Sequence, residues 1–547
     1  MAKNPLVRCL ALEAPPPDLG DNTADLDRLK KAVHEGLSGD EAGRPLVIPR
    51  ARMAETAASF RRHGFRGTAL LNMLPAAVEI VDFLPQTPST VPVAAIDLGT
   101  THLEGVLLDS ASGKRLARAH GENSQIKYGD DILSRIHFAD RNDIPGCGAT
   151  GKDRPAGAAT GLQILHECII TSINDLLTDL CGQAGIQRNG IRACCISGNT
   201  TMVHLLLNLS PHHICREPYI PMVNAPDPCA ARELDIDIHQ AAPLWILPSI
   251  GSYFGGDLIS GILTSGLDGA QKPAMLIDVG TNAEVILGNR DWLIACAGAA
   301  GPALEGGVAG MGMRAGPGAI DRVRLDTDTW HLDYRTIDSA PPAGLCGSGL
   351  IDLVAELYLA RIIDLRGKFR TDIEPESPQH AAFLRQHLLR DEGGGRFLVA
   401  PAEKAAHQHD VIVNQIDLDS LIRSKAAMYA ILTTLVAQVD LEFTDIDTIF
   451  VAGAFGKHID PQRAITLGML PDLPLSTYRS LGNSSLRGAE LILTDEAVRK
   501  RSMAIPGRIT YIELNVNQEF MIRFSGSRFI PHTDPSLFPS VPFFQSA

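Results

Sequence analysis

The chain has 547 residues, which exceeds the roughly 250–300 at which a single hydrophobic core stops growing, so we expect two or more domains. Hydrophobic residues make up 45% and charged residues 20% of the sequence, a composition that excludes a largely disordered chain. The net charge of −14, without a cluster of Lys and Arg, disfavours nucleic acid as a partner.

The N-terminal segment up to about Gly20 is rich in proline and polar residues, so residues 1–20 are predicted to be a linker. It lacks the apolar core of a signal peptide, and no later apolar stretch reaches the ~20 residues that span a bilayer. We therefore expect a cytoplasmic protein without membrane contact. From Asp21 apolar residues recur at helical spacing, and a small α/β middle domain is predicted over residues 21–90.

Two near-copies of one short motif follow, VAAIDLGTT and AMLIDVGTN, and their aspartates are 278 − 97 = 181 residues apart. In each copy an apolar strand delivers an aspartate, a glycine and a hydroxyl residue into a turn. The repeat predicts two copies of one α/β lobe within residues 91–547, facing each other across a cleft. We expect lobe I at about 93–270, lobe II at about 274–500, and a C-terminal tail, 501–547, packed on lobe II.

These turns fit the chemistry of a bound nucleoside triphosphate, which carries about four negative charges and usually a Mg²⁺ ion that keeps several waters. Asp97 and Asp278 are predicted to hold Mg²⁺ through water and to act in catalysis. Gly99 and Gly280 would let the backbone approach phosphate oxygens. The further donors are Thr100, Thr101, Thr281 and Asn282. A single copy could be an ordinary turn between two strands, but two copies on matching strands favour binding of ATP.

Four further glycine turns are candidates for the same nucleotide site, because each follows an apolar run or precedes a helix. Any one of them could be a tight turn and nothing more. No GxxxxGK[ST] motif occurs, so a P-loop is not the predicted phosphate site. The candidate residues in these turns are Gly198, Asn199 and Thr200; Glu305, Gly306 and Gly307; Gly347 and Ser348; and Gly453 and Gly456.

The order of these motifs resembles the acetate kinase, sugar kinase, Hsp70 and actin superfamily. More specifically, the chain resembles the reductive activators of corrinoid proteins and their RamA-like relatives. The stretches that carry this resemblance include IKYGDDILSRI, GNTTMVHLLL, REPYIP, GPALEGG, LCGSGLID, AGAFGKHID, GMLPDLPL, GNSSLRGA and YIELNVNQEFM. The resemblance implies a two-lobed, ribonuclease H-like α/β ATPase fold preceded by a small α/β domain.

In this family ATP drives the reduction of a corrinoid methyl-carrier protein from inactive Co(II) to Co(I), and the resemblance implies that activity and a homodimer here. Family members also carry an iron–sulfur module, which needs clustered cysteines. The ten cysteines of this chain form no CxxC pair, Cys9 stands alone near the N-terminus, and no cysteine follows Cys346. We therefore expect no iron–sulfur cluster in this chain and a separate ferredoxin-like electron donor.

Two other functions remain open at this point. The first is an ATP-switched, chaperone-like protein that binds a corrinoid protein without electron transfer. The second is a metabolite kinase, which is less favoured because no catalytic base is placed as in sugar kinases.

Overall fold

The computed structural model describes residues 4–141, 160–280, 282–298, 310–370, 372–391, 394–514 and 517–544. The chain forms two compact units, Met1–Thr264 with Ser484–Gly507, and Ser265–Asn483 with Arg508–Ala547. The segment Ser484–Gly507, which the sequence analysis assigned largely to lobe II, therefore belongs to the first unit. The remaining C-terminal residues, Arg508–Ala547, belong to the second unit.

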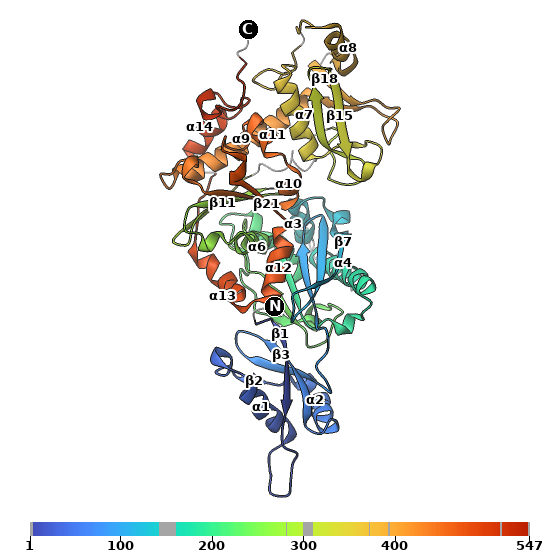
Figure 1. Ribbon diagram of the computed structural model, residues 1–547, viewed down its shortest axis with the longest axis vertical. Helices are drawn as coiled ribbons and strands as arrows, with labels where there is room; N and C mark the ends of the chain where they lie inside the picture. The colour runs from blue at the N-terminus through green and yellow to red at the C-terminus, as the bar shows by residue number, and fades with distance from the viewer. Residues whose placement is uncertain are drawn as a thin grey trace, which may run out of the picture. The chain divides into compact units, whose positions relative to one another are not determined.

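The first unit begins with a small domain in which two helices pack on a four-stranded sheet of order β1-β3-β4-β2 (Figure 1). Its core contains Leu29, Phe60 and Phe83. Its elements are β1 (Val7–Glu13), α1 (Asp25–Gly36), β2 (Leu46–Val47), α2 (Arg50–Arg62), β3 (Arg66–Met73) and β4 (Val78–Leu84).

Strand β1 corrects the prediction that residues 1–20 are a linker. All seven residues of β1 pair antiparallel with β3. Leu10 and Leu12 pack against the core of the small domain, and the proline-rich run begins only after the strand ends. The prolines therefore mark the end of a strand, and the domain starts well before Asp21.

The larger sheet of the first unit has the order β7-β6-β5-β8-β10-β9. The long helix α4 (Gly161–Ala184) packs along β6 and β7, with a stripe that includes Leu165, Ile169 and Leu176 buried against the sheet (Figure 1). The strands are β5 (Pro92–Leu98), β6 (His102–Asp109), β7 (Arg115–Glu122), β8 (Cys194–Gly198), β9 (Cys229–Ala230) and β10 (Pro243–Ile246). The other helices are α3 (Ile132–Asp140), α5 (Thr200–Leu206), α6 (Gly256–Ser265), α12 (Ser484–Thr494) and α13 (Glu496–Ala504).

The second unit is built on a sheet of order β21-β20-β11-β12-β13-β22, with α9 (Gln415–Ala437) packed on β12 and β13. The strands are β11 (Ala274–Val279), β12 (Ala283–Gly288), β13 (Leu293–Gly298), β20 (Thr448–Ala452), β21 (Tyr478–Gly482) and β22 (Ile509–Tyr511). The C-terminal segment is anchored to α9, because the buried Lys425 donates a hydrogen bond to the carbonyl of Pro531 at 2.7 Å.

Two smaller sheets complete the second unit, β15-β14-β16 and β17-β18-β19 (Figure 1). Their strands are β14 (Ala319–Asp326), β15 (His331–Thr336), β16 (Gly344–Leu345), β17 (Leu388–Asp391), β18 (Gly394–Ala400) and β19 (Val411–Asn414). The remaining helices are α7 (Gly347–Leu359), α8 (Pro378–His387), α10 (Gly453–His458), α11 (Pro461–Leu467) and α14 (Gln518–Gly526).

The large sheets of the two units share one topology, which confirms the predicted duplication of an α/β lobe. In each, three antiparallel strands (β7-β6-β5, or β13-β12-β11) continue into two parallel strands (β8-β10, or β20-β21). Asp97 on β5 is paired with Ser197 on β8, and Asp278 on β11 is paired with Ala452 on β20. The two aspartates therefore occupy equivalent positions in the two sheets.

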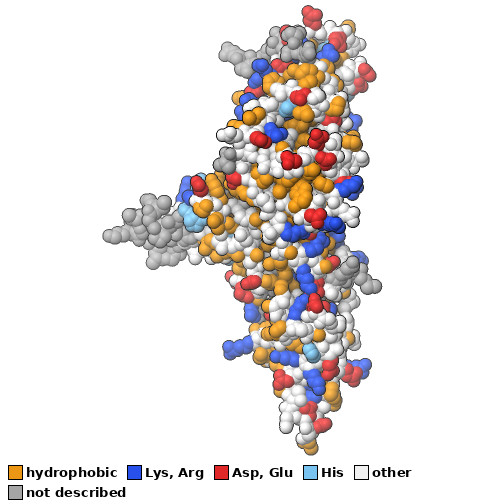
Figure 2. Space-filling view, turned by 90° about the vertical axis from the view of Figure 1, so that its left-hand side faces the viewer, with side chains coloured by type: hydrophobic (Ala, Val, Ile, Leu, Met, Phe, Trp, Pro, Cys, Tyr) orange, Lys and Arg blue, Asp and Glu red, His pale blue; other side chains and the backbone are white. Residues whose placement is uncertain are grey.

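Charged side chains of both signs are interspersed on the face drawn in Figure 2, without an extended area of one sign. This agrees with the absence of a basic cluster in the sequence. Within the described part of the chain, no helix is both long and apolar enough to cross a membrane.

Candidate functional site

The Asp97 turn joins β5 to β6 in a tight hairpin. A β-carbon on Gly99 would lie 2.4 Å from the carbonyl oxygen of His102, so only glycine fits this turn. Asn123 fixes the turn from outside, since its Nδ2 donates to the Gly99 carbonyl at 3.0 Å and its backbone N–H donates to the Thr101 carbonyl at 2.8 Å. Asn123 was not predicted from the sequence, because it lies outside the motif.

The turn after β8 lies beside the Asp97 turn, as its register with β5 requires. Asn199 caps α5 by accepting a hydrogen bond from the Met202 N–H at 3.0 Å, and its Nδ2 donates to Thr100 Oγ1 at 3.2 Å. Thr200 is buried, and its hydroxyl donates to the Gly251 carbonyl at 3.1 Å. Asp97, Gly99 and Thr100 are therefore brought together with Gly198 and Asn199, whereas the Thr200 hydroxyl serves the fold.

Asp257, which the sequence analysis missed, lies next to these turns in the first turn of α6. A β-carbon on Gly255 would lie 2.4 Å from Asn199 Cα and 2.6 Å from Asp257 Oδ1. The backbone of Gly255 therefore lies against both residues, and Asp257 is close to the Asn199 turn. Desolvation raises the pKa of Asp257 from 3.8 to about 6. A carboxyl group with a raised pKa beside a predicted phosphate turn is a candidate acid or base. The only sequence signal for it is the tripeptide GGD.

Ser485, also missed, donates a hydrogen bond from its hydroxyl to Asp97 Oδ1 at 2.6 Å. It lies in the first turn of α12, within the GNSSLRGA stretch. Asp257 and Ser485 occupy the second position of their helices, and each helix follows the second strand of a parallel pair, β10 of β8-β10 or β21 of β20-β21. The duplicated fold thus places a polar residue at the same helical position in both copies.

The Asp278 turn of the second unit repeats the arrangement of the Asp97 turn. The Gly280 N–H donates to the Asn282 carbonyl at 2.9 Å, which closes the turn between β11 and β12. Gly453 follows β20 with φ +76°, and a β-carbon on it would lie 2.8 Å from Asp278 Oδ1. At Gly456 a β-carbon would lie 2.4 Å from the Val451 carbonyl oxygen. Both glycines are required for α10 to begin this close to β20 and β11.

The remaining predicted site residues lie either in the turn before α7 or outside the described part of the chain. Ser348 is buried, and its hydroxyl donates to the Asp321 carbonyl on β14 at 3.0 Å. Gly347 opens the same helix, α7, so this turn serves to pack α7 on β14. Thr281, Glu305, Gly306 and Gly307 lie outside the described residues.

Several of the described cysteines are core residues. Cys194 and Cys195 on β8 and Cys296 on β13 are fully buried. Burial raises the pKa of all three thiols, that of Cys194 to about 12. Among the residues that the structure describes, no group of three or more His, Cys, Asp and Glu side chains could hold a metal ion.

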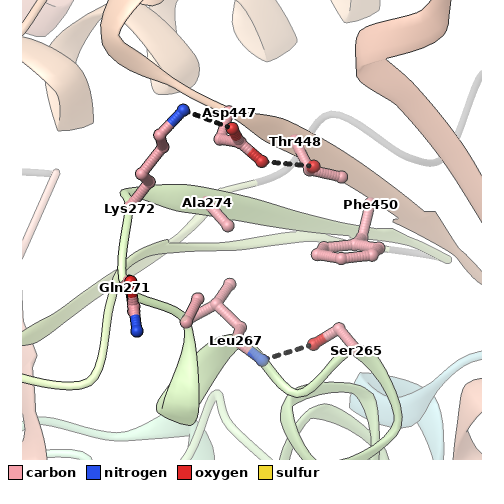
Figure 3. Close-up of a pocket in the computed structure, with 9 residues that line it drawn as sticks. Ser265, Leu267, Gln271, Lys272, Ala274, Asp447, Thr448 and Phe450 are labelled. Atoms are coloured by element: carbon pink, nitrogen blue, oxygen red, sulfur yellow. Dashed lines mark hydrogen bonds and ion pairs between the residues drawn. The ribbon is translucent and has the colours of Figure 1, made fainter.

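A pocket of ≈ 330 Å³ in the second unit is distinct from the Asp278 turn (Figure 3). Lys272 Nζ and Asp447 Oδ1 form an ion pair at 3.2 Å at its edge, and Phe450 also lines it. The pocket lies at the start of β11 and β20, near Ala274 and Thr448, whereas Asp278 and Ala452 lie four residues further along the two strands. That separation is roughly 13 Å at ~3.3 Å per residue, so this pocket does not contain the predicted phosphate turn.

Comparison with known proteins identifies two family models that match most of the chain. One, described as the C-terminal domain of RACo, the ASKHA domain, matches residues 272–542. The other, described as the RACo middle region, matches residues 93–146 and 154–270. The segment that this family calls its middle region is therefore lobe I, and the small domain that we predicted as a middle domain precedes it.

Three relatives are similar over most of their length. The corrinoid activation enzyme RamQ of Eubacterium limosum is 29% identical over 522 residues, which are 95% of this chain and 82% of that protein. The [Co(II) methylated amine-specific corrinoid protein] reductase of Methanosarcina barkeri is 22% identical over 434 residues, 76% of this chain and 72% of that protein. The solved structure of a reductive activator for corrinoid, iron-sulfur protein superposes with a TM-score of 0.85 and 35% identity, covering 99% of this chain and 81% of that chain.

Proposed function

This chain belongs to the family of reductive activators of corrinoid proteins, and from that membership we propose that it uses ATP to drive a corrinoid protein from Co(II) to Co(I). The relatives named for corrinoid activation and for Co(II) corrinoid protein reduction support this proposal. The single observation that carries it is the similarity to the corrinoid activator over 99% of this chain.

The two aspartate turns are the proposed binding site for Mg·ATP. Asp97 and Asp278 would hold the metal ion through water, and Gly99 and Gly453 fit this role because neither position leaves space for a side chain. Backbone and side-chain donors of the two turns would bind phosphate oxygens. Bound Mg·ATP supplies the free energy of binding and hydrolysis, and the protein residues orient its phosphates.

The electron is proposed to come from a separate low-potential, ferredoxin-like protein. One electron reduces Co(II) to Co(I), and the donor is oxidised by one electron. Buried thiols such as Cys194 and Cys296, which belong to the β-sheet cores, support a role for these cysteines in packing. We also propose a homodimer, as the family resemblance implies, and a cytoplasmic location, as expected from the sequence; light scattering after gel filtration tests the dimer.

Calorimetric titration with Mg·ATP and a steady-state ATPase assay test the proposed site. Asp97→Ala and Asp278→Ala are each expected to weaken Mg·ATP binding or abolish hydrolysis without unfolding the protein, since both aspartates lie at strand ends and are only half-buried. Asp447→Ala is the matched control, because Asp447 is an aspartate at the opposite end of the same sheet as Asp278. Wild-type affinity and turnover in both site variants would contradict the assignment.

Retention of a corrinoid protein tests the partner. The tagged protein is incubated with native cell extract, with and without a non-hydrolysable ATP analogue, and retained proteins are identified by mass spectrometry. We expect nucleotide-dependent retention of a corrinoid methyl-carrier protein. Retention of that protein without any Co(II) reduction under reducing conditions would instead support the chaperone-like function.

A further inference from the structure

We propose that Ser485 is a positioning residue for Asp97, and that it acts at the end of a chain of buried serine hydroxyls. This inference rests on the proposed function, in which Asp97 holds the Mg·ATP complex. It adds a residue from a distant part of the sequence that does not itself need to touch the nucleotide.

The hydroxyl chain runs from α6 through β8 to α12 and ends at the carboxylate of Asp97. Ser260 Oγ and Ser197 Oγ are 3.0 Å apart, Ser197 Oγ and Ser485 Oγ are 2.9 Å apart, and Ser485 Oγ lies 2.6 Å from Asp97 Oδ1. Ser197 and Ser260 are fully buried, and Ser485 is 7% exposed. These hydroxyls are therefore shielded from competing water, which strengthens each hydrogen bond.

The ionised carboxylate determines the direction of the hydrogen bond between Ser485 and Asp97. An ionised aspartate only accepts hydrogen bonds, and a serine hydroxyl has one proton to donate. Ser485 is therefore the donor to Asp97 Oδ1, and it is also placed as the donor toward Ser197 Oγ, so its single proton faces two acceptors, of which the charged carboxylate is the stronger. Hydrogen bonds to charged groups are the stronger ones in proteins, so this contact holds the carboxylate in one orientation.

Close packing of α12 on α6 keeps Ser485 in place. A β-carbon on Gly488, one turn after Ser485, would lie 2.3 Å from Ser260 Cβ. Glycine at position 488 thus allows the two helices to approach until the serine of one lies against the backbone of the other. This helix contact therefore helps to hold the donor to Asp97 in place.

In the sequence, α12 of the first unit follows directly after β21 of the second unit. Gly482, the last residue of β21, is paired with Ala452 on β20, and Ala452 is paired with Asp278 on β11. Only Asn483 and Ser484 separate Gly482 from Ser485.

Substitution of Ser485 tests this role, with Ser484 as the matched control. Ser484 is the preceding residue on α12 and is also buried, but its hydroxyl has no hydrogen-bond partner among the described residues. We expect Ser485→Ala to lower kcat of the ATPase about tenfold and to raise the Mg²⁺ concentration needed for half-maximal rate, because a hydrogen bond to a charged group is lost. Ser485→Thr, which keeps the hydroxyl, should restore most of the rate, and Ser484→Ala should match the wild type.

Thermal denaturation and a nucleotide-free crystal structure separate a positioning role from a structural one. We expect Ser485→Ala and Ser484→Ala to have similar melting temperatures, and the Asp97 carboxylate to rotate in Ser485→Ala alone. Equal kinetics and an unchanged Asp97 rotamer in Ser485→Ala would overturn the inference. A wild-type protein that binds no ATP would contradict the proposed function, whereas the rotamer of Asp97 would still decide the role of Ser485.

Discussion

The backbone of Gly453 lies directly against the carboxylate of Asp278: a β-carbon at position 453 would stand 2.8 Å from Oδ1. Gly453 also has φ +76°, a backbone conformation that residues other than glycine rarely adopt. Because Gly453 follows the parallel strand next to Asp278, the aspartate and the start of α10 form one rigid corner of the sheet. This corner is the counterpart of Gly198 and Asn199 beside Asp97.

Gly453→Ala is predicted to impair nucleotide binding by displacing Asp278. The new methyl group would contact Oδ1, so the carboxylate or the start of α10 must move. We expect ATP affinity to fall about tenfold or more, the range for disturbing a charged hydrogen-bonding group. Isothermal titration calorimetry with Mg·ATP measures the effect.

Gly266→Ala is the control for backbone strain in that experiment. Gly266 has φ +71° and belongs to the same unit, but a β-carbon there meets no atom within 4 Å. Both variants therefore pay the cost of a left-handed residue, roughly 1–2 kcal/mol, and only Gly453→Ala adds the contact with Asp278. Equal ATP affinity in the two variants would show that the contact is irrelevant to binding.

Hydrogen exchange is predicted to detect the nucleotide at both turns at once. If Asp97 and Asp278 bind one Mg·ATP, amides near Gly99, Gly280 and Gly453 should gain protection together, because ATP then favours one closed state by its differential affinity. Exchange is measured by mass spectrometry with and without Mg·ATP, and Asp97→Ala serves as the control. Protection confined to one of the two turns would point to a half-site and contradict binding by both.

The parts of the site that could be predicted from sequence are the local ones. The repeated motifs around Asp97 and Asp278 each contain their strand, aspartate and glycine within nine residues, so the pattern itself carries the information. Ser485 is 388 residues from Asp97, and only the packing of α12 brings them together. Strand β1 was missed for a different reason: its partner β3 follows about 60 residues later, and the prolines after Glu13 hid a short alternating pattern.

Asp257 is predicted to make the protein less stable as pH rises. Its pKa is about 6 in the folded protein, against 3.8 as the ordinary value. Above pH 6 the folded protein bears the cost of a desolvated charge. As pH falls from about 6 to about 4, the folded carboxyl group takes up its proton before the unfolded one, and the cost disappears. Asp257→Asn should therefore be more stable than the wild type at pH 7.5 and equal to it near pH 4.

Urea denaturation of both proteins at several pH values measures this difference. Asp27→Asn is the matched control, since Asp27 also lies in the first turn of a helix, α1, but is exposed. Its loss removes only a favourable interaction with the helix dipole, so Asp27→Asn should be slightly less stable at neutral pH. A pH-independent difference between Asp257→Asn and the wild type would contradict the raised pKa.

The last prediction concerns the electron donor. Cys194 and Cys296, two buried thiols whose pKa burial raises, lie in strands of the two large sheets, and protonated buried thiols are poor ligands for iron. We therefore expect this chain, when purified, to be colourless and to bind no stoichiometric iron.

With ATP and a reductant that needs a cluster as relay, it should leave a Co(II) corrinoid protein unreduced. A reduced low-potential ferredoxin added in trans should transfer one electron to cobalt, and only when ATP is present. Anaerobic absorption spectroscopy of the corrinoid follows the formation of Co(I), and ferredoxin without this chain is the control. Stoichiometric iron in the isolated chain would contradict a separate donor, and Co(I) formation without ATP would contradict an ATP-driven step.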